Sequence, residues 1–216
     1  MTLEQMITDF QTESLPNIPQ EVLQTMMQAT QELVASGIAG KALQTGEQAP
    51  GFTLPNTRGE LVSLAPLLEN GPVVLNFYRG AWCPYCSIEL KALQDALPQI
   101  TALGATVLSI SPNVVEKSAA FAAENPFDFD ILSDVDNQVA KNYRLVFTLA
   151  DKLHPIYAKF GIDLPVFDGN DRFELPMPAT YVLRPDGTIA AGFVHADYTQ
   201  RMEPADIIKY LGDLRP

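Results

Sequence analysis

The sequence predicts an α/β fold in which helices flank a mixed central sheet, with an N-terminal helical extension. Two continuous apolar runs, residues 73–78 and 105–110, have the composition of buried strands in a parallel sheet. A helical pattern separates them, and a right-handed crossover would make the two strands parallel. Near the C-terminus, two strand-like segments flank Arg184-Pro185-Asp186-Gly187, a hairpin signature that adds antiparallel strands.

The extension, residues 1–45, is expected to contain an amphipathic helix over residues 20–36. Its apolar side chains recur at spacings of four, three and four residues: Val22, Met26, Ala29 and Leu33. Gly37 and Gly40 would end the helix. The helix could pack on its own domain, form the arm of a homodimer or act as a lid, and the sequence leaves these alternatives open.

The remaining domain, residues 46–216, begins with an extended, turn-rich segment in which Gly59 closes a short hairpin. The first buried strand is followed by a long helix that Gly104 ends. We then expect a helix over residues 114–123, strands over 127–132, 179–183 and 188–194, and a last helix over 204–214 with proline in its first turn.

The composition narrows the function classes. The 216 residues carry a formal net charge of −12, which argues against nucleic acid or an anionic membrane as a partner. No apolar run approaches the roughly 20 residues of a membrane helix, and the start lacks the pattern of a secretory signal. We therefore expect a cytoplasmic protein, in which closely spaced cysteines serve redox chemistry or metal binding.

The only two cysteines lie three residues apart in Trp82-Cys83-Pro84-Tyr85-Cys86, where the first buried strand gives way to a helix. Pro84 suits the first helical position, which makes Cys83 the expected N-cap. The helix dipole and free backbone N–H groups would stabilise a thiolate there and lower its pKa. The spacing also lets the second sulfur reach an intermediate formed on the first.

Two structural interpretations of the pair are weaker. A disulfide across four residues closes a very short loop and would constrain the chain little. A zinc site would need two more ligands, and the only histidines, His154 and His195, lie in unrelated contexts. We therefore expect no metal and no cofactor.

At these residues the chain resembles the thioredoxin superfamily, and within it the peroxiredoxin-like proteins related to alkyl hydroperoxide reductase and thiol-specific antioxidant. The resemblance covers roughly residues 46–212 and implies a thioredoxin-like fold. It is carried by Gly46-Glu47-Gln48-Ala49-Pro50-Gly51-Phe52-Thr53-Leu54, Phe77-Tyr78-Arg79-Gly80-Ala81-Trp82-Cys83-Pro84-Tyr85-Cys86, Tyr143-Arg144-Leu145-Val146-Phe147-Thr148, Leu175-Pro176-Met177-Pro178 and Ala179-Thr180-Tyr181-Val182-Leu183 before Pro185-Asp186-Gly187.

Two alignments imply different nucleophiles. The T-x-x-C motif of peroxiredoxins fits without a gap and places Cys86 at the cysteine that attacks peroxide, with Cys83 at the threonine. The W-C-x-x-C motif of thioredoxins instead makes Cys83 the attacking sulfur. Cys-Pro-Tyr-Cys is also the glutaredoxin tetrapeptide, although no further glutathione-site signature accompanies it.

Departures from both patterns remain. At the position of Arg79, peroxiredoxins usually have proline. At the position of Pro178, many of them carry an arginine. Pro178 instead matches the cis-proline of thioredoxins, which would free the Met177 backbone to pair with an extended substrate. The buried acid of thioredoxins corresponds to Asn76, an amide that cannot act as a base. Glu89 could replace it, but we expect a solvated helix glutamate.

The supporting residues are Arg79, Trp82, Tyr85 and Pro178. Arg79 is always cationic and could lower a thiol pKa or bind a substrate anion, the alternative being a surface ion pair. Trp82 is expected to shield the site, and Tyr85 to be exposed and contact substrate. We expect a packed or surface role for His195 and a surface loop over residues 163–173.

The leading hypothesis is a hydroperoxide reductase in which Cys86 forms a sulfenic acid and Cys83 resolves it to a disulfide. A dithiol such as a thioredoxin or glutaredoxin system would recycle the pair. One alternative is a thiol–disulfide oxidoreductase in which Cys83 attacks protein disulfides. The other is a redox-responsive binding or sensor module without turnover.

Overall fold

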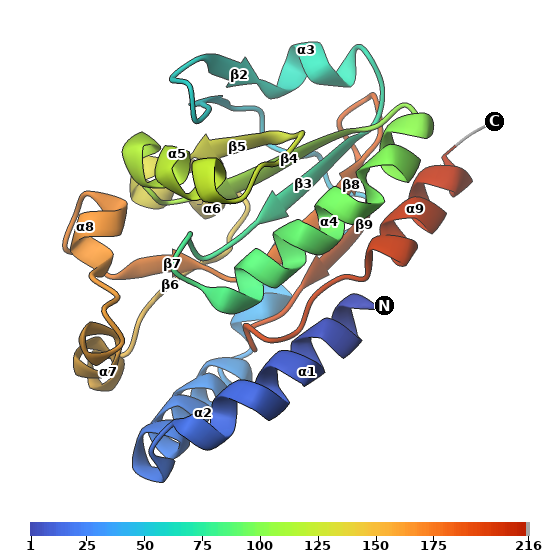
Figure 1. Cartoon of the computed structure of the whole chain (residues 1–216). Helices are drawn as coiled ribbons and strands as arrows, with labels where there is room; N and C mark the ends of the chain where they lie inside the picture. The colour runs from blue at the N-terminus through green and yellow to red at the C-terminus, as the bar shows by residue number, and fades with distance from the viewer. Residues whose placement is uncertain (215–216) are drawn as a thin grey trace.

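The computed structural model describes residues 1–214, in which a five-stranded mixed sheet lies between two layers of helices (Figure 1). The strand order is β5-β4-β3-β8-β9. β3 pairs in parallel with β4, and β4 with β5, whereas β3–β8 and β8–β9 are antiparallel. The sheet strands are β3 (Val73–Phe77), β4 (Thr106–Ser111), β5 (Asp130–Ser133), β8 (Ala179–Leu183) and β9 (Ile189–Val194). The expected mixed sheet, with its parallel crossover and its C-terminal hairpin, is confirmed.

Alternate residues of the central strands face opposite layers, as the period of two in a β-strand requires. Val74 packs with α1, α4 and α9, whereas Leu75 and Phe77 pack into a second core on the other face. The helices of the first layer are α1 (Leu3–Ser14), α4 (Pro84–Ala102), α5 (Val115–Glu124) and α9 (Pro204–Asp213). Residues from α3 (Leu64–Leu68) and α6 (Gln138–Asn142) complete the second core.

Two small antiparallel sheets lie outside the central one. β1 (Thr53–Pro55) pairs with β2 (Leu61–Ser63), which confirms the short hairpin around Gly59. β6 (Val146–Thr148) pairs with β7 (Glu174–Pro176), a pairing that the sequence did not predict. Between them lie α7 (His154–Lys159) and α8 (Leu164–Asp168). The expectation of a plain surface loop over residues 163–173 is therefore wrong, and the α8 residue Asp168 is buried.

The N-terminal extension packs on the rest of the chain. Helix α2 (Gln20–Ala35) matches the expected helix and contacts the 3₁₀ turn Asp151–Leu153, whereas α1 was not predicted. α1 lies along α4, with Leu3 and Ile7 in the first core (Figure 1). The backbone N–H groups of Leu3 and Glu4 donate to the carboxylate of Glu203 at 3.0 and 2.7 Å, because a helix N-terminus attracts negative charge. Of the alternatives for α2, the structure shows a helix that packs on its own domain.

The remaining 3₁₀ turns cover Leu15–Asn17, Ile38–Lys41 and Val135–Asn137. Among the helices of the described residues, none has the length and apolarity needed to cross a membrane.

Candidate active site

The cysteine pair lies where β3 ends and α4 begins. Cys83 is the N-cap of α4 with extended backbone angles, Pro84 is the first helical residue and Cys86 the third, as the sequence predicted. Both cysteines are free, and they are 1% and 0% exposed. The pair is therefore positioned by a helix N-terminus but enclosed by protein.

The two thiols differ in their electrostatic surroundings. Burial alone would raise the pKa of Cys83, but a hydrogen bond from Cys86 and the charges of Arg79 and Arg201 lower that pKa to about 5. Burial and the hydrogen bond with Cys83 raise the pKa of Cys86 well above its ordinary value. The two opposite shifts favour a single negative charge on the pair near neutral pH, with Cys83 as the sulfur whose ionised form is stabilised.

Arg79 is buried beside the cysteines, so the alternative of a surface ion pair is wrong. Its guanidinium donates to the Tyr157 hydroxyl and lies 4.4 and 4.9 Å from the rings of Tyr198 and Trp82. Its Nε, by contrast, is buried without a hydrogen-bond partner among the described residues. This enclosed cation lies where it stabilises a thiolate through the low-dielectric interior.

Arg201 is a second buried cation that the sequence analysis did not single out. Its Nη2 lies 3.5 Å from Cys86 Sγ, and its Nε lies 2.7 Å from Glu89 Oε2. The Nε–H is not aligned with that oxygen for a hydrogen bond, so opposite charge holds the pair together. The segment after β9 carries Arg201, and no motif of the cysteine region points to it.

Glu89 lies one helical turn after Cys86 and is 2% exposed, so the expectation of a solvated glutamate is wrong. Burial raises the pKa of its carboxyl to about 7, even though the charge of Arg201 opposes the shift. Asn76, the residue at the position of the thioredoxin acid, donates a hydrogen bond to Glu89 and a 3.3 Å bond to Thr180 Oγ1. The buried acid of this site therefore comes from α4 rather than from the strand.

Aromatic side chains cover the pair. Tyr85 is buried between Phe10 of α1 and Tyr198, with ring centroids 5.3 and 5.4 Å away, so the prediction that Tyr85 is exposed is wrong. Trp82 is half-buried and makes an edge contact with Tyr157 at 5.5 Å, which agrees with a shielding role.

The loop before the cysteines is held from the side by Asn113. Its Oδ1 accepts the Ala81 N–H at 2.8 Å, and its Nδ2 donates to the buried Asp168 carboxylate at 2.7 Å. Gly80 adopts a φ of +149°, and a Cβ there would lie 2.5 Å from Trp82 Nε1. The loop therefore requires glycine at this position.

Pro178 lines a cavity that Arg79 also lines, but it does not have the predicted form. Residues 1–214 contain no cis peptide bond, so the bond before Pro178 is trans and the cis-proline prediction is wrong. The Met177 N–H donates to Leu145 O at 2.8 Å, so this backbone group is already paired. His195 is half-buried, and its Nδ1 accepts the Asp197 N–H at 3.0 Å, which agrees with a structural role. No group of three His, Cys, Asp or Glu residues in the described chain could hold a metal ion.

Comparison with known proteins agrees with this architecture. Peroxiredoxin Bcp of Escherichia coli (strain K12) is 35% identical over 101 residues, which are 47% of this chain and 64% of that protein. The chain thus spans just under two thirds of the length of that relative. The crystal structure of peroxidoxin BcpB from Mycobacterium tuberculosis has a TM-score of 0.63 at 26% identity, covering 81% of this chain and 99% of that one.

The fold is also that of Xylella fastidiosa PrxQ, at 19% identity and a TM-score of 0.61 over 80% of this chain and 95% of that one. The family model described as AhpC/TSA matches residues 45–191, a span that includes both cysteines, strands β3, β4, β5 and β8 of the thioredoxin-like sheet, and the start of β9. The chain therefore belongs to the AhpC/TSA family.

Proposed function

We propose that this chain is a thiol-dependent hydroperoxide reductase in which Cys83 and Cys86 cycle between two thiols and a disulfide. The observation that carries the proposal is a pair of free, buried cysteines at the start of α4, beside the buried cations of Arg79 and Arg201. The peroxiredoxin names of the relatives support a peroxide as the oxidant.

The chemistry follows from this pair. The thiolate sulfur attacks the terminal oxygen of the hydroperoxide, the O–O bond breaks, and the leaving alkoxide takes a proton to become an alcohol. The second sulfur then attacks the resulting sulfenic acid, a disulfide forms, and the hydroxyl leaves as water with the proton of the second thiol. An external dithiol of the thioredoxin or glutaredoxin type returns both electrons.

The charge distribution supports Cys83 as the sulfur that attacks first. The alignment to T-x-x-C had assigned that step to Cys86, whose pKa is raised by burial and by the neighbouring thiolate. Cys83 has the lowered pKa and the N-cap position, so its sulfur is the one that is ionised before peroxide arrives.

A second candidate function is thiol–disulfide exchange with Cys83 as nucleophile. The ionised Cys83 favours it, because the same thiolate would attack a protein disulfide. The paired Met177 N–H and the enclosure of both sulfurs argue against docking of an extended substrate chain there.

The test compares Cys83→Ser with Cys86→Ser for peroxide consumption with a dithiol, for sulfenic acid trapping, and for insulin disulfide reduction. We expect wild type to consume peroxide, Cys86→Ser to accumulate a sulfenic acid and Cys83→Ser to form none. If only the Cys83→Ser variant forms a sulfenic acid, Cys86 is the sulfur that attacks first. A wild-type protein that consumes no more peroxide than the dithiol does would overturn the peroxidase proposal.

A further inference from the structure

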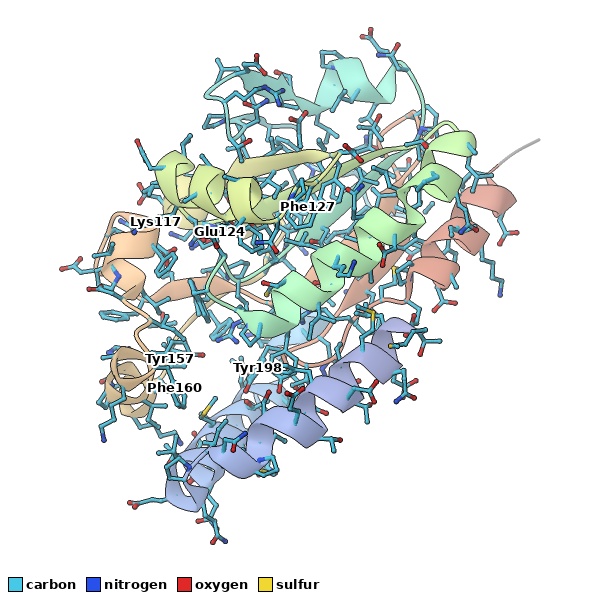
Figure 2. The ribbon with its side chains drawn as sticks, viewed as in Figure 1. Lys117, Glu124, Phe127, Tyr157, Phe160 and Tyr198 are labelled. Atoms are coloured by element: carbon cyan, nitrogen blue, oxygen red, sulfur yellow. The ribbon has the colours of Figure 1, made fainter. Side chains whose placement is uncertain are left out.

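A cavity of about 250 Å³ lies between α2 and the active-site residue Arg79. Ala29 and Leu33 of α2 form one wall, and Leu149 and Leu153 lie among the residues opposite. In Figure 2, Tyr157 is labelled beside α7 and Tyr198 below the start of α4, and both residues line this cavity. The N-terminal extension therefore forms one side of a partly open space that is bordered by the active-site residue Arg79.

The walls of the cavity are mainly apolar, while two of the residues that line it are charged. Glu32 is paired with Lys152 at 2.7 Å, and the other is Arg79. Arg79 borders the space, its Nε–H is buried without a hydrogen-bond partner, and no ion pair involves it among residues 1–214. A guanidinium with no carboxylate partner favours a ligand that brings an oxygen to this side of the cavity. The same guanidinium acts on the charge of Cys83, which links the cavity to the reacting sulfur.

The size and composition of the cavity define its ligand. An apolar cavity of about 150 Å³ in another protein holds benzene, so this space can hold a ring or branched alkyl group with a short polar end. A ligand with an apolar body and an oxygen-bearing end would place the body against Ala29 and Leu33 and the oxygen at Arg79.

Resting on the proposed peroxide reduction, we propose that this cavity is the binding site for the organic substituent of a hydroperoxide, with α2 as the element that determines specificity. The matched family region covers residues 45–191, so α2 and the wall formed by Tyr198 lie outside it. The extension thus adds selectivity to a site whose chemistry comes from the family domain.

The test narrows the cavity with Ala29→Phe and uses Ala35→Phe as the matched control. Ala35 is an exposed residue of the same helix, so this variant adds the same ring outside the cavity. For Ala29→Phe we expect kcat/KM for cumene hydroperoxide to fall at least about tenfold while that for hydrogen peroxide changes less than about twofold. Ala35→Phe should leave both values near wild type.

A binding measurement on the reduced wild-type protein keeps the inference testable if Ala29→Phe does not fold. Trp82 is the only tryptophan, and Arg79 lies 4.9 Å from its ring. Titration with 2-phenyl-2-propanol, the alcohol product of cumene hydroperoxide, should change its fluorescence in a saturable way. Absence of saturation would overturn the inference.

Two kinetic outcomes separate the inference from the function on which it rests. If a folded Ala29→Phe variant loses kcat/KM equally for both peroxides, the substrate site is overturned while peroxide reduction stands. The same holds if the variant is oxidised normally in a single turnover and only its recycling by the dithiol is slower. A wild-type protein that reduces neither peroxide would instead overturn the proposed function.

Discussion

Glu89 Oε2 and Arg201 Nε lie 2.7 Å apart in an ion pair whose side chains are 3% and 1% exposed. Arg201 also reaches Cys86 Sγ at 3.5 Å, so the pair joins the second turn of α4 to the segment before α9. Both charges are almost fully buried. Removal of either partner would therefore leave the other charge uncompensated and would lower the stability of the fold.

Glu89→Gln should destabilise the fold by about 3–5 kcal/mol, because it leaves the Arg201 guanidinium without its partner. The measurement is urea unfolding at pH 8, where the wild-type carboxylate is ionised. Asp95→Asn is the control, because it removes the exposed ion pair with Lys91 in the same helix and should cost less than about 1 kcal/mol. The double variant Glu89→Gln/Arg201→Met should recover much of the loss; equal effects of Glu89→Gln and Asp95→Asn would contradict the buried pair.

Arg79→Met should raise the pKa of Cys83 from its value of about 5, because a positive charge that stabilises the thiolate is removed. The thiolate absorbance of the reduced protein, followed against pH, measures this shift. Arg144→Met is the matched control, since Arg144 is an exposed arginine paired with Glu47 far from the cysteines in the chain. A titration unchanged by Arg79→Met would show that this cation does not act on the thiolate.

Gly80→Ala should lower stability by roughly 1–3 kcal/mol, because the new Cβ meets Trp82 Nε1 and Asn113 Nδ2 and the backbone angle disfavours any other residue. Thermal unfolding reports the loss, and a change in Trp82 fluorescence reports the displaced ring. Gly51→Ala serves as control because it has no neighbour within 4 Å of its Cβ and no positive φ. Similar unfolding temperatures for the two variants would show that a Cβ at position 80 is not crowded by Trp82 and Asn113.

Local patterns were enough to predict most of the fold. The apolar run of β3, the helical spacing of α4 and the Pro84 signal at its start each depend on neighbours in sequence, and all three are confirmed. The β6–β7 pairing joins Phe147 to Leu175 across strands of only three residues. Such short segments give little periodicity, and their partners lie far apart in the chain.

The site was predictable only where its residues adjoin the cysteines. Arg79 and Trp82 were identified from their distance to Cys83 in sequence, but Arg201 lies more than a hundred residues beyond Cys86. Glu89 was misjudged because glutamate on a helix is usually exposed, and nothing local shows that Arg201 compensates its charge. The burial of Tyr85 likewise depends on Phe10 of α1, a helix that the sequence analysis missed.

The Asp168 carboxyl predicts a pH dependence of stability. Burial raises its pKa from 3.8 to about 7, although the hydrogen bond from Asn113 opposes the shift. Between those values the folded chain binds more protons at this group than the unfolded chain does, so the free energy of unfolding falls as the pH rises from about 4 to about 7.

Asp168→Asn should remove this contribution, because the amide keeps an oxygen that accepts from Asn113 at 2.7 Å in wild type but carries no titrating proton. Relative to wild type, the variant should gain on the order of 2–4 kcal/mol between pH 4.5 and 7.5. Urea midpoints measured across this range give the difference, and the contribution of Glu89 cancels because both proteins retain it. Asp171→Asn, an exposed neighbour, should keep the wild-type dependence. Parallel pH profiles for Asp168→Asn and wild type would show that Asp168 titrates alike in the folded and unfolded chains.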